Sequence, residues 1–198
     1  MHEKDIVLRL ARKRRSIRSY RKEKVDLEKL LYAIKVAIEA PSGANQQPWA
    51  FIIIDDERLK KRIRKTCEEL ERNFYKNVKG WLREWLLSRG FSWRKPFLTD
   101  APYLIVVLSE RNKPYAIEST WLAIGYLLLA LEERGLASLT YTPPNAKEII
   151  KLLGVPESYE LQTIIPVGLP AENKQKEPRK GINEVVHYNM WNKYEIPS

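Results

Sequence analysis

The sequence has very few of the side chains that form disulfides and metal sites. Its 198 residues include a single cysteine, Cys67, and only two histidines, His2 and His187. One thiol excludes an intrachain disulfide and most cysteine-based metal sites, and two histidines so far apart argue against a histidine-based site. Cys67 precedes Glu68 and Glu69, which disfavour a thiolate, so we interpret it as structural. We therefore predict no bound metal, and the lack of disulfides favours a cytoplasmic protein.

Long hydrophobic runs and glycine-rich loops are also absent. The longest apolar run, Trp121–Leu131, is far shorter than the roughly 20 residues that a membrane-spanning helix needs. The start of the chain, Met1–Leu10, is charged and lacks the apolar centre of a signal peptide. Neither a phosphate-binding loop nor a dinucleotide-binding glycine motif is present in the sequence. We therefore expect no membrane partner and no nucleotide site of those two kinds.

Positive charge exceeds negative charge, with 35 Lys and Arg against 25 Asp and Glu and a net charge of +10. Such a balance can indicate a nucleic-acid-binding domain, which is the second class of function that we consider. However, the charges are dispersed and mixed in sign except in the run Arg12–Arg15, and no aromatic residues interleave that run. We favour a solvated surface with a few anion-binding positions and no nucleic-acid partner. Many Lys, Glu and Arg residues beside few Cys and Met are also typical of thermophilic proteins.

The hydrophobic pattern predicts a single α+β domain over residues 1–198. The stretch Glu118–Glu133 is apolar on nearly all sides, which is typical of a helix buried in a core or a subunit interface. Helical periodicity predicts further helices over Asp5–Lys13, Leu27–Glu39, Arg58–Tyr75 and Ala146–Leu153. Apolar runs predict strands over Ala50–Ile54, Tyr103–Ser109, Leu136–Thr142 and Glu160–Val167. The expected helix caps are Asp26, Asp55 or Asp56, and Asn145, with Gly135 and Gly154 as stops.

The stretch Pro41–Trp49 joins a helix to a strand and is rich in polar and rigid residues. Its prolines fix the backbone at both ends, and Gly43 allows a backbone shape or a close ligand approach that other residues resist. Ser42, Asn45 and the two glutamines after it offer neutral hydrogen-bond donors and acceptors. The stretch is therefore either a binding loop for a planar heteroaromatic ligand or an ordinary helix-to-strand connection.

Two charged segments allow both a functional and a purely structural interpretation. Arg14–Tyr20 contains three arginines and two serines. Guanidinium groups pair bidentately with phosphate oxygens, so this segment is either a phosphate site or a solvated basic turn. Phe74–Phe97 mixes aromatic anchors such as Trp81 and Trp85 with many charges, which suits either a mobile lid or a fixed pair of surface helices.

Several motifs together resemble the FMN-dependent nitroreductase superfamily, in the same order along nearly the whole chain. The motifs are Arg14–Arg18, Pro41–Trp49, Gly135–Leu136 with the strand after it, Pro166–Pro170 and Arg179. The resemblance implies a three-layer α/β/α sandwich and an intertwined homodimer with one FMN at each of two interface sites. It also implies that the cofactor is bound by Arg14, Arg15, Ser16, Ile17, Arg18, Ser42, Gly43, Thr140, Tyr141, Thr142 and Arg179, with Ser42 and Gly43 reaching it from the other subunit.

A narrower resemblance is to the iodotyrosine deiodinase branch of that superfamily. It rests on Ala101–Ile105, on Glu118–Ser119 at the start of the long helix, and on Gly135–Asn145. The stretch between Tyr75 and Lys95 is one residue shorter than is usual in this branch. The membrane anchor of the animal members is missing, so we expect a soluble protein.

The branch implies a substrate clamp for the zwitterion of a halotyrosine. In such a clamp Glu71 binds the ammonium and Lys95 binds the carboxylate, both through charge-assisted hydrogen bonds. Tyr75, four residues after Glu71 and hence on the same helix face, adds a phenolic hydrogen bond. The Ala44 N–H binds the substrate phenolate, and the Thr142 hydroxyl, the implied catalytic group, lies near flavin N5. Without the resemblance, Glu71 and Lys95 would be interpreted as solvated surface charges.

The expected protein is thus a homodimeric FMN oxidoreductase that removes halide from halotyrosines through one-electron steps of the flavin. The resemblance implies an active-site lid at about residues 71–97 and a C-terminal extension at about residues 169–198 across the partner subunit. The alternative is a general nitroreductase or quinone reductase, which would need an open site above the flavin. Either enzyme takes a small aromatic substrate, a halotyrosine or a nitroaromatic, and electrons from NAD(P)H or another reductant.

Overall fold

The computed structural model describes residues 5–192, so His2 and the end of the predicted C-terminal extension lie outside the described residues. The helices are α1 (Ile6–Lys13), α2 (Leu27–Ala37), α3 (Glu57–Asn77), α4 (Gly80–Ser88), α5 (Phe97–Asp100), α6 (Ala116–Glu133), α7 (Lys147–Leu152) and α8 (Ile182–Val185), with a 3-10 turn, η2 (Gly43–Asn45). The strands are β1 (Trp49–Ile54), β2 (Tyr103–Glu110), β3 (Ala137–Ser138) and β4 (Tyr159–Gly168). Within the described residues, no helix has the length and apolar character that crossing a bilayer requires.

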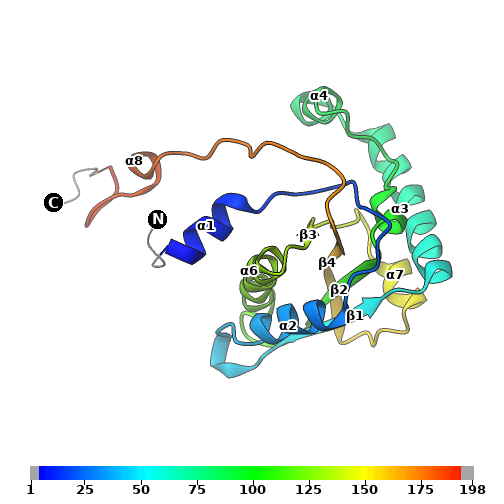
Figure 1. Ribbon diagram of the computed structural model, residues 1–198, viewed down its shortest axis with the longest axis horizontal. Helices are drawn as coiled ribbons and strands as arrows, with labels where there is room; N and C mark the ends of the chain where they lie inside the picture. The colour runs from blue at the N-terminus through cyan, green and yellow to red at the C-terminus, as the bar shows by residue number, and fades with distance from the viewer. Residues whose placement is uncertain (1–4, 193–198) are drawn as a thin grey trace.

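The strands form one antiparallel sheet in the order β1-β2-β4-β3 (Figure 1). Side chains alternate between the two faces of this sheet, so Leu104 and Val106 of β2 enter one core while Ile105 and Val107 enter the other. Helices α2 and α6 cover one face, and α3, α5 and α7 cover the opposite face. This arrangement confirms the predicted three-layer sandwich.

Two of the predicted N-caps are present and determine where the helices begin. Asp26 accepts a hydrogen bond from the Glu28 N–H at the start of α2, at 3.0 Å. Asp56 accepts from the Leu59 N–H at the start of α3, at 2.5 Å. Each carboxylate satisfies a backbone donor that the first turn of a helix leaves without a partner. From this start, α3 runs past the sheet and its C-terminal half leads toward α4 (Figure 1).

The segment after α1 is held against the edge of the sheet beside β3. The Ile17 N–H donates to the Ser138 carbonyl at 3.1 Å, and Ser16 forms a parallel bridge with Ser138. Tyr20 forms an antiparallel bridge with Pro170, and its buried hydroxyl donates to the Ile17 carbonyl at 2.8 Å. These bonds place the early arginines at one edge of the sheet, next to the end of β4.

The predicted strand Leu136–Thr142 is wrong in extent, because only Ala137–Ser138 form β3. Pairing with β4 resumes at Tyr141, which bridges Ile164 in the register that β3 already has. The two residues in between leave the ladder and line a cavity. An apolar run with β-branched residues cannot reveal such an interruption, because the same side chains would also fit an unbroken strand.

The chain after β4 first runs along its own subunit. The Ala171 N–H donates to the Ser19 carbonyl at 2.9 Å, and Arg15 Nε donates to the Lys174 carbonyl at 2.9 Å. Residues 169–180, here called the C-terminal strap, therefore lie on the N-terminal segment of the same subunit. Beyond the strap, α8 stands well away from the sheet (Figure 1). The extension across a partner subunit stays a prediction.

Candidate active site

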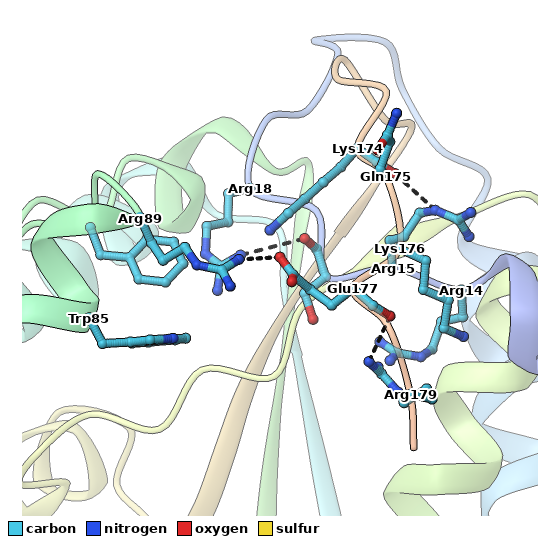
Figure 2. A pocket seen from close by; sticks show the side chains of 12 residues that line it. Arg14, Arg15, Arg18, Trp85, Arg89, Lys174, Gln175, Lys176, Glu177 and Arg179 are labelled. Atoms are coloured by element: carbon cyan, nitrogen blue, oxygen red, sulfur yellow. Dashed lines mark hydrogen bonds and ion pairs between the residues drawn. The ribbon is translucent and has the colours of Figure 1, made fainter. Parts of the chain in front are cut away.

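A cavity of about 370 Å³, here called the arginine cavity, lies between the segment after α1, the C-terminal strap and the end of α4 (Figure 2). Seven of its twelve lining residues are Arg or Lys, and one, Glu177, is acidic. Arg14 and Arg179 approach from one side, and Arg18 and Arg89 from the opposite side. The lining residues are Arg14, Arg15, Ser16, Arg18, Trp85, Arg89, Phe91, Lys174, Gln175, Lys176, Glu177 and Arg179. The structure thus brings the predicted early arginines and Ser16 together with Arg179.

The Glu172 carboxylate fixes the backbone that carries these arginines. Its Oε1 accepts from the Arg18 N–H at 2.5 Å and from the Ser19 N–H at 3.1 Å. Ile17 is 5% exposed and belongs to the core, and its N–H is bonded to Ser138. Ile17 therefore shapes the segment and does not itself line the arginine cavity, although we predicted it as a cofactor contact.

Burial and like charges act on the cations around the arginine cavity. The pKa of Arg14 is lowered first by burial and then by the neighbouring charge of Arg179. The pKa of Lys176 is lowered by the same two causes, with Arg14 and Arg179 both contributing. Burial also lowers the pKa of Arg18, while Glu172 partly opposes this shift. Cations that are held together with so little acid favour a bound anion, and guanidinium forks match the oxygens of a phosphate.

A second cavity of about 580 Å³, here called the clamp cavity, adjoins the first, because Arg18, Trp85 and Phe91 line both. It lies between the C-terminal half of α3, the segment after α4 and the residues after β3. Its lining residues are Arg18, Glu71, Phe74, Tyr75, Trp85, Leu86, Gly90, Phe91, Ser92, Arg94, Lys95, Pro96, Phe97, Leu139, Thr140, Tyr141 and Thr142. This set contains all three predicted clamp residues and the three predicted residues after β3.

A nearly buried ion pair lies in the wall of the clamp cavity. Lys95 Nζ is 3.2 Å from Glu71 Oε2, and the two side chains are 11% and 7% exposed. Lys95 Nζ also donates to the Ser92 carbonyl at 2.8 Å, and the Tyr141 hydroxyl donates to Glu71 Oε1 at 3.0 Å. Burial lowers the pKa of Lys95, and the adjacent Glu71 charge opposes this shift. The interpretation of Glu71 and Lys95 as solvated surface charges is therefore wrong.

The predicted lid segment is anchored at its ends and exposed in its middle. Tyr75, one turn after Glu71, lines the clamp cavity with Lys95 Nζ 5.3 Å from the centre of its ring. Helix α4, in the middle of the segment, has no buried residue. After α4, the Phe91 ring packs under the Arg18 guanidinium, with 4.5 Å between Arg18 Cζ and the ring centre. The segment therefore contacts residues of both cavities.

Thr142, the predicted catalytic residue, stands at the wall of the clamp cavity. Its hydroxyl donates to the Gln162 carbonyl of β4 at 2.9 Å. The hydroxyl proton is thus directed at the protein itself, while the residue remains accessible from the cavity. A bond from this hydroxyl to flavin N5 stays a prediction.

Ser42, Gly43 and Ala44 line neither of the two cavities within one chain. The Gly43 N–H donates to Ser119 Oγ at 3.1 Å, and a Cβ atom at Gly43 would lie 2.7 Å from the Tyr115 ring. Glycine is required here because the loop approaches its own chain so closely. Ala44 has a left-handed backbone, with φ of 49°. Contacts of this loop with a flavin stay predictions and would need a second subunit.

Several lining residues of the arginine cavity were missed in the sequence. Lys174 and Lys176 have the composition of a solvated tail, and only their closeness to Arg179 offered a signal. Arg89 forms an ion pair with Glu177 of the C-terminal strap, and no local pattern links residues so far apart. The hydrogen bond from Tyr141 to Glu71 was missed as well, since a tyrosine in an apolar run is expected to pack in the core.

Known proteins resemble this chain along most of its length. Residues 11–169 match the sequence profile of the Nitroreductase family. The iodotyrosine deiodinase of Thermotoga neapolitana is 54% identical over 182 residues, which cover 92% of this chain and 97% of that protein. Iodotyrosine deiodinase 1 of Mus musculus is 36% identical over 177 residues, which cover 83% of this chain and 62% of that protein.

Solved structures show the same relationship. A crystal structure of oxidized iodotyrosine deiodinase bound to FMN and 3-iodo-L-tyrosine has a TM-score of 0.90 and 53% identity, and the match covers 93% of this chain and 100% of that chain. An FMN-dependent nitroreductase from Clostridium difficile R20291 has a TM-score of 0.72 and 27% identity, with coverage of 92% and 98%. The resemblance inferred from the sequence motifs is thereby confirmed. The chain belongs to the Nitroreductase family and, within it, to the iodotyrosine deiodinase branch.

Proposed function

We propose that this protein is an FMN-dependent oxidoreductase that removes halide reductively from halotyrosines such as iodotyrosine. The observation that carries the proposal is that the two cavities adjoin and share Arg18 and Phe91 in their walls. One cavity offers cations for a phosphate, and the other offers a buried acid and a buried base for an amino acid zwitterion. The relative with 54% identity is an iodotyrosine deiodinase, and the structure with 53% identity holds FMN and 3-iodo-L-tyrosine.

The donors of the arginine cavity fit the phosphate of FMN. Guanidinium groups bind phosphate oxygens bidentately, and a hydroxyl can add a further donor. The residues that would hold the phosphate are Arg14, Arg15, Ser16, Arg18 and Arg179. Thr140 and Thr142 belong to the wall of the adjoining cavity, where the flavin ring would lie. Bound FMN would supply the two electrons that the reaction consumes.

The Glu71–Lys95 pair would open to receive the amino acid group of the substrate. Glu71 would accept from the substrate ammonium, and Lys95 would donate to the substrate carboxylate. Two new ion pairs then replace one internal pair, so that no buried charge is left without a partner. Tyr75 lies beside both groups, and burial followed by the Glu71 charge raises the pKa of its phenol. The Tyr75 hydroxyl therefore stays protonated at neutral pH and can donate.

The reaction balances as the exchange of a halogen for hydrogen on the aromatic ring. The carbon–halogen bond breaks, the halogen leaves as halide, and the ring carbon takes up a proton together with two electrons. The protein residues bind and orient the substrate, and the segment around α4 keeps water from the site. NAD(P)H or another reductant would restore the electrons in each turnover.

We also propose that the working unit is a homodimer. Trp121, Leu122 and Tyr126 of α6 are 40%, 49% and 40% exposed in the single chain, and Ile182 and Trp191 after the C-terminal strap are 66% and 78% exposed. Large apolar side chains exposed together are typical of a protein interface. A second copy would cover these surfaces, and it would bring its own loop after α2 to a site that has none of that loop's residues within one chain.

Titration of the oxidised, FMN-loaded protein with 3-iodo-L-tyrosine tests the proposed function. We expect saturable quenching of the flavin fluorescence, since a bound aromatic ring would stack on the flavin. 3-Iodo-L-tyrosine methyl ester, which keeps the iodinated ring but lacks the carboxylate charge, should bind at least about tenfold more weakly, because Lys95 then has no partner. A protein that ignores 3-iodo-L-tyrosine but reduces nitroaromatics or quinones would instead be a general nitroreductase.

A further inference from the structure

We propose that Tyr141 is a positioning residue for substrate binding, whose hydroxyl holds the Glu71 carboxylate where the substrate ammonium must meet it. This inference rests on the proposed function. The Tyr141 hydroxyl donates to Glu71 Oε1 at 3.0 Å, while Glu71 Oε2 lies 3.2 Å from Lys95 Nζ. The two oxygens of this carboxylate thus have separate partners, one from the protein interior and one in the clamp itself.

The arrangement matters most when substrate replaces the internal ion pair. Within residues 5–192, the side chain of Glu71 has hydrogen-bond and ion-pair partners only in Tyr141 and Lys95. Once Lys95 turns to the substrate carboxylate, Tyr141 remains as the one protein group that fixes the Glu71 side chain. A glutamate has several rotatable bonds, so a fixed donor reduces the conformational entropy that binding would otherwise remove.

Tyr141 is itself held rigidly. Its N–H donates to the Ile164 carbonyl at 3.0 Å, and its carbonyl accepts from the Ile164 N–H at 2.7 Å and from the Thr163 hydroxyl at 3.1 Å. Its ring packs edge-on against Phe97, with 5.4 Å between the ring centres, and the residue is 8% exposed. Neither the backbone nor the ring needs to be ordered when substrate binds, which is what a supporting residue requires.

The chemistry around the Tyr141 hydroxyl keeps it a donor. Burial, followed by the neighbouring Cys67 and Glu71, raises the pKa of Tyr141 above its ordinary value. Burial likewise raises the pKa of Cys67, to about 12. Both groups are therefore neutral near pH 7, and the Glu71 carboxylate is the one acid among these three side chains that can meet an ammonium group. The Tyr141 hydroxyl thus stabilises the Glu71 carboxylate and carries no negative charge of its own that would attract the substrate ammonium.

The substitution Tyr141→Phe tests the role, because it removes the hydroxyl and keeps the ring. The two probes are 3-iodo-L-tyrosine and 2-iodophenol, which carries the halogenated ring without the amino acid group. We expect the Kd of 3-iodo-L-tyrosine to rise about tenfold or more, since a hydrogen bond to a charged group is lost. The Kd of 2-iodophenol should stay within about twofold of the parent. Equal weakening of both ligands would show a merely structural role and overturn the proposal.

The chain offers a matched control in Tyr32, whose hydroxyl donates to Glu133 Oε2 at 2.7 Å on the opposite face of the sheet. Tyr32→Phe removes the same kind of bond and should change neither Kd. A second measurement combines Tyr141→Phe with Glu71→Gln. If Tyr141 acts through Glu71, adding Tyr141→Phe to the Glu71→Gln variant should weaken the binding of 3-iodo-L-tyrosine by less than about twofold further.

The outcomes separate this inference from the proposed function. A parent protein that does not bind 3-iodo-L-tyrosine would overturn the proposed function and, with it, the role of Tyr141. A parent that binds it, beside a Tyr141→Phe variant that binds it equally well, would overturn only the role of Tyr141. A full tenfold effect of Tyr141→Phe in the Glu71→Gln background would also overturn it, since the hydroxyl would then act on another group.

Discussion

Lys95 Nζ lies 3.2 Å from Glu71 Oε2, and this nearly buried pair joins the two ends of the segment that carries α4. The pair lies in the wall of the clamp cavity, and in the proposed function it supplies the two charges that an amino acid substrate needs. In the arginine cavity, by contrast, cations greatly outnumber acids. We therefore expect substrate to bind by ion-pair exchange in the clamp cavity and a phosphate to bind directly in the arginine cavity.

Glu71→Gln should weaken the binding of 3-iodo-L-tyrosine by at least about tenfold at pH 7. The variant keeps the size of the side chain but removes the charge that pairs with the substrate ammonium. Quenching of flavin fluorescence measures the effect. Glu69→Gln, an equal change at an exposed position of the same helix, serves as the control and should bind like the parent. Parent-like binding by Glu71→Gln would remove Glu71 from the clamp.

Glu68→Gln should lower the stability of the protein at neutral pH but not in acid. Burial alone would raise the pKa of Glu68, but bonds from the Lys95 N–H at 2.8 Å and Arg64 Nε at 2.7 Å outweigh it and hold the pKa below its ordinary value of 4.5. A lowered carboxyl pKa contributes stability that is complete above pH 4.5 and is lost as the pH falls through the lowered value.

Chemical unfolding at pH 7 and near pH 3 measures this difference. At pH 7 we expect the free energy of unfolding of Glu68→Gln to be about 1 kcal/mol below that of the parent, with allowance for partial solvent screening. Toward pH 3 the difference should shrink, because Glu68 of the parent then takes up a proton. A constant difference at both pH values would show that the charge of Glu68 contributes nothing.

Arg14→Gln should weaken FMN binding by about tenfold or more. Removing one guanidinium takes away charge-assisted hydrogen bonds to the phosphate, and the remaining cations cannot replace their geometry. The Kd of FMN for apoprotein, followed by flavin fluorescence, measures the loss. Arg62→Gln, on the exposed side of α3, lowers the net charge equally and should bind FMN like the parent. Equal effects of both substitutions would reduce the role of Arg14 to general electrostatics.

Leu122→Glu should convert the proposed dimer into a monomer that retains little FMN. Leu122 is 49% exposed on the apolar outer side of α6, and a buried carboxylate there would have no partner. Light scattering during size-exclusion chromatography gives the mass, and the flavin absorbance of the same peak gives the FMN content. Trp81→Glu, at a residue of α4 that is 75% exposed, should leave both quantities unchanged. A Leu122→Glu protein that stays dimeric would place the interface elsewhere.

Much of the fold could be predicted from local sequence signals. Asp26 and Asp56 mark helix starts because a carboxylate before an apolar periodic run satisfies free backbone donors. The β2 and β4 strands were recognisable as continuous apolar runs, since both faces of the sheet are covered. The extent of β3 was not predictable, because it depends on where residues 139 and 140 leave the pairing with β4, and the apolar run would equally fit an unbroken strand.

The residues of the candidate site also differ in how far their positions could be predicted from the sequence. Arg14 and Arg18 stand in a dense motif, so their place together at one cavity could be predicted from the sequence. Glu71 and Lys95 required the family resemblance, since nothing local reveals that a charged helix residue will be buried against a distant lysine. The support from Tyr141 required the structure itself, because it depends on the exact approach of two elements that are 70 residues apart.

Anaerobic reoxidation of the flavin by substrate tests whether this protein dehalogenates halotyrosines. The FMN-loaded protein is reduced chemically without oxygen, the excess reductant is removed, and 3-iodo-L-tyrosine is added while flavin absorbance and free iodide are followed. We expect the flavin to return to its oxidised spectrum, with one iodide and one tyrosine formed for each flavin. A flavin that stays reduced, with no iodide released although the ligand is bound, would contradict it.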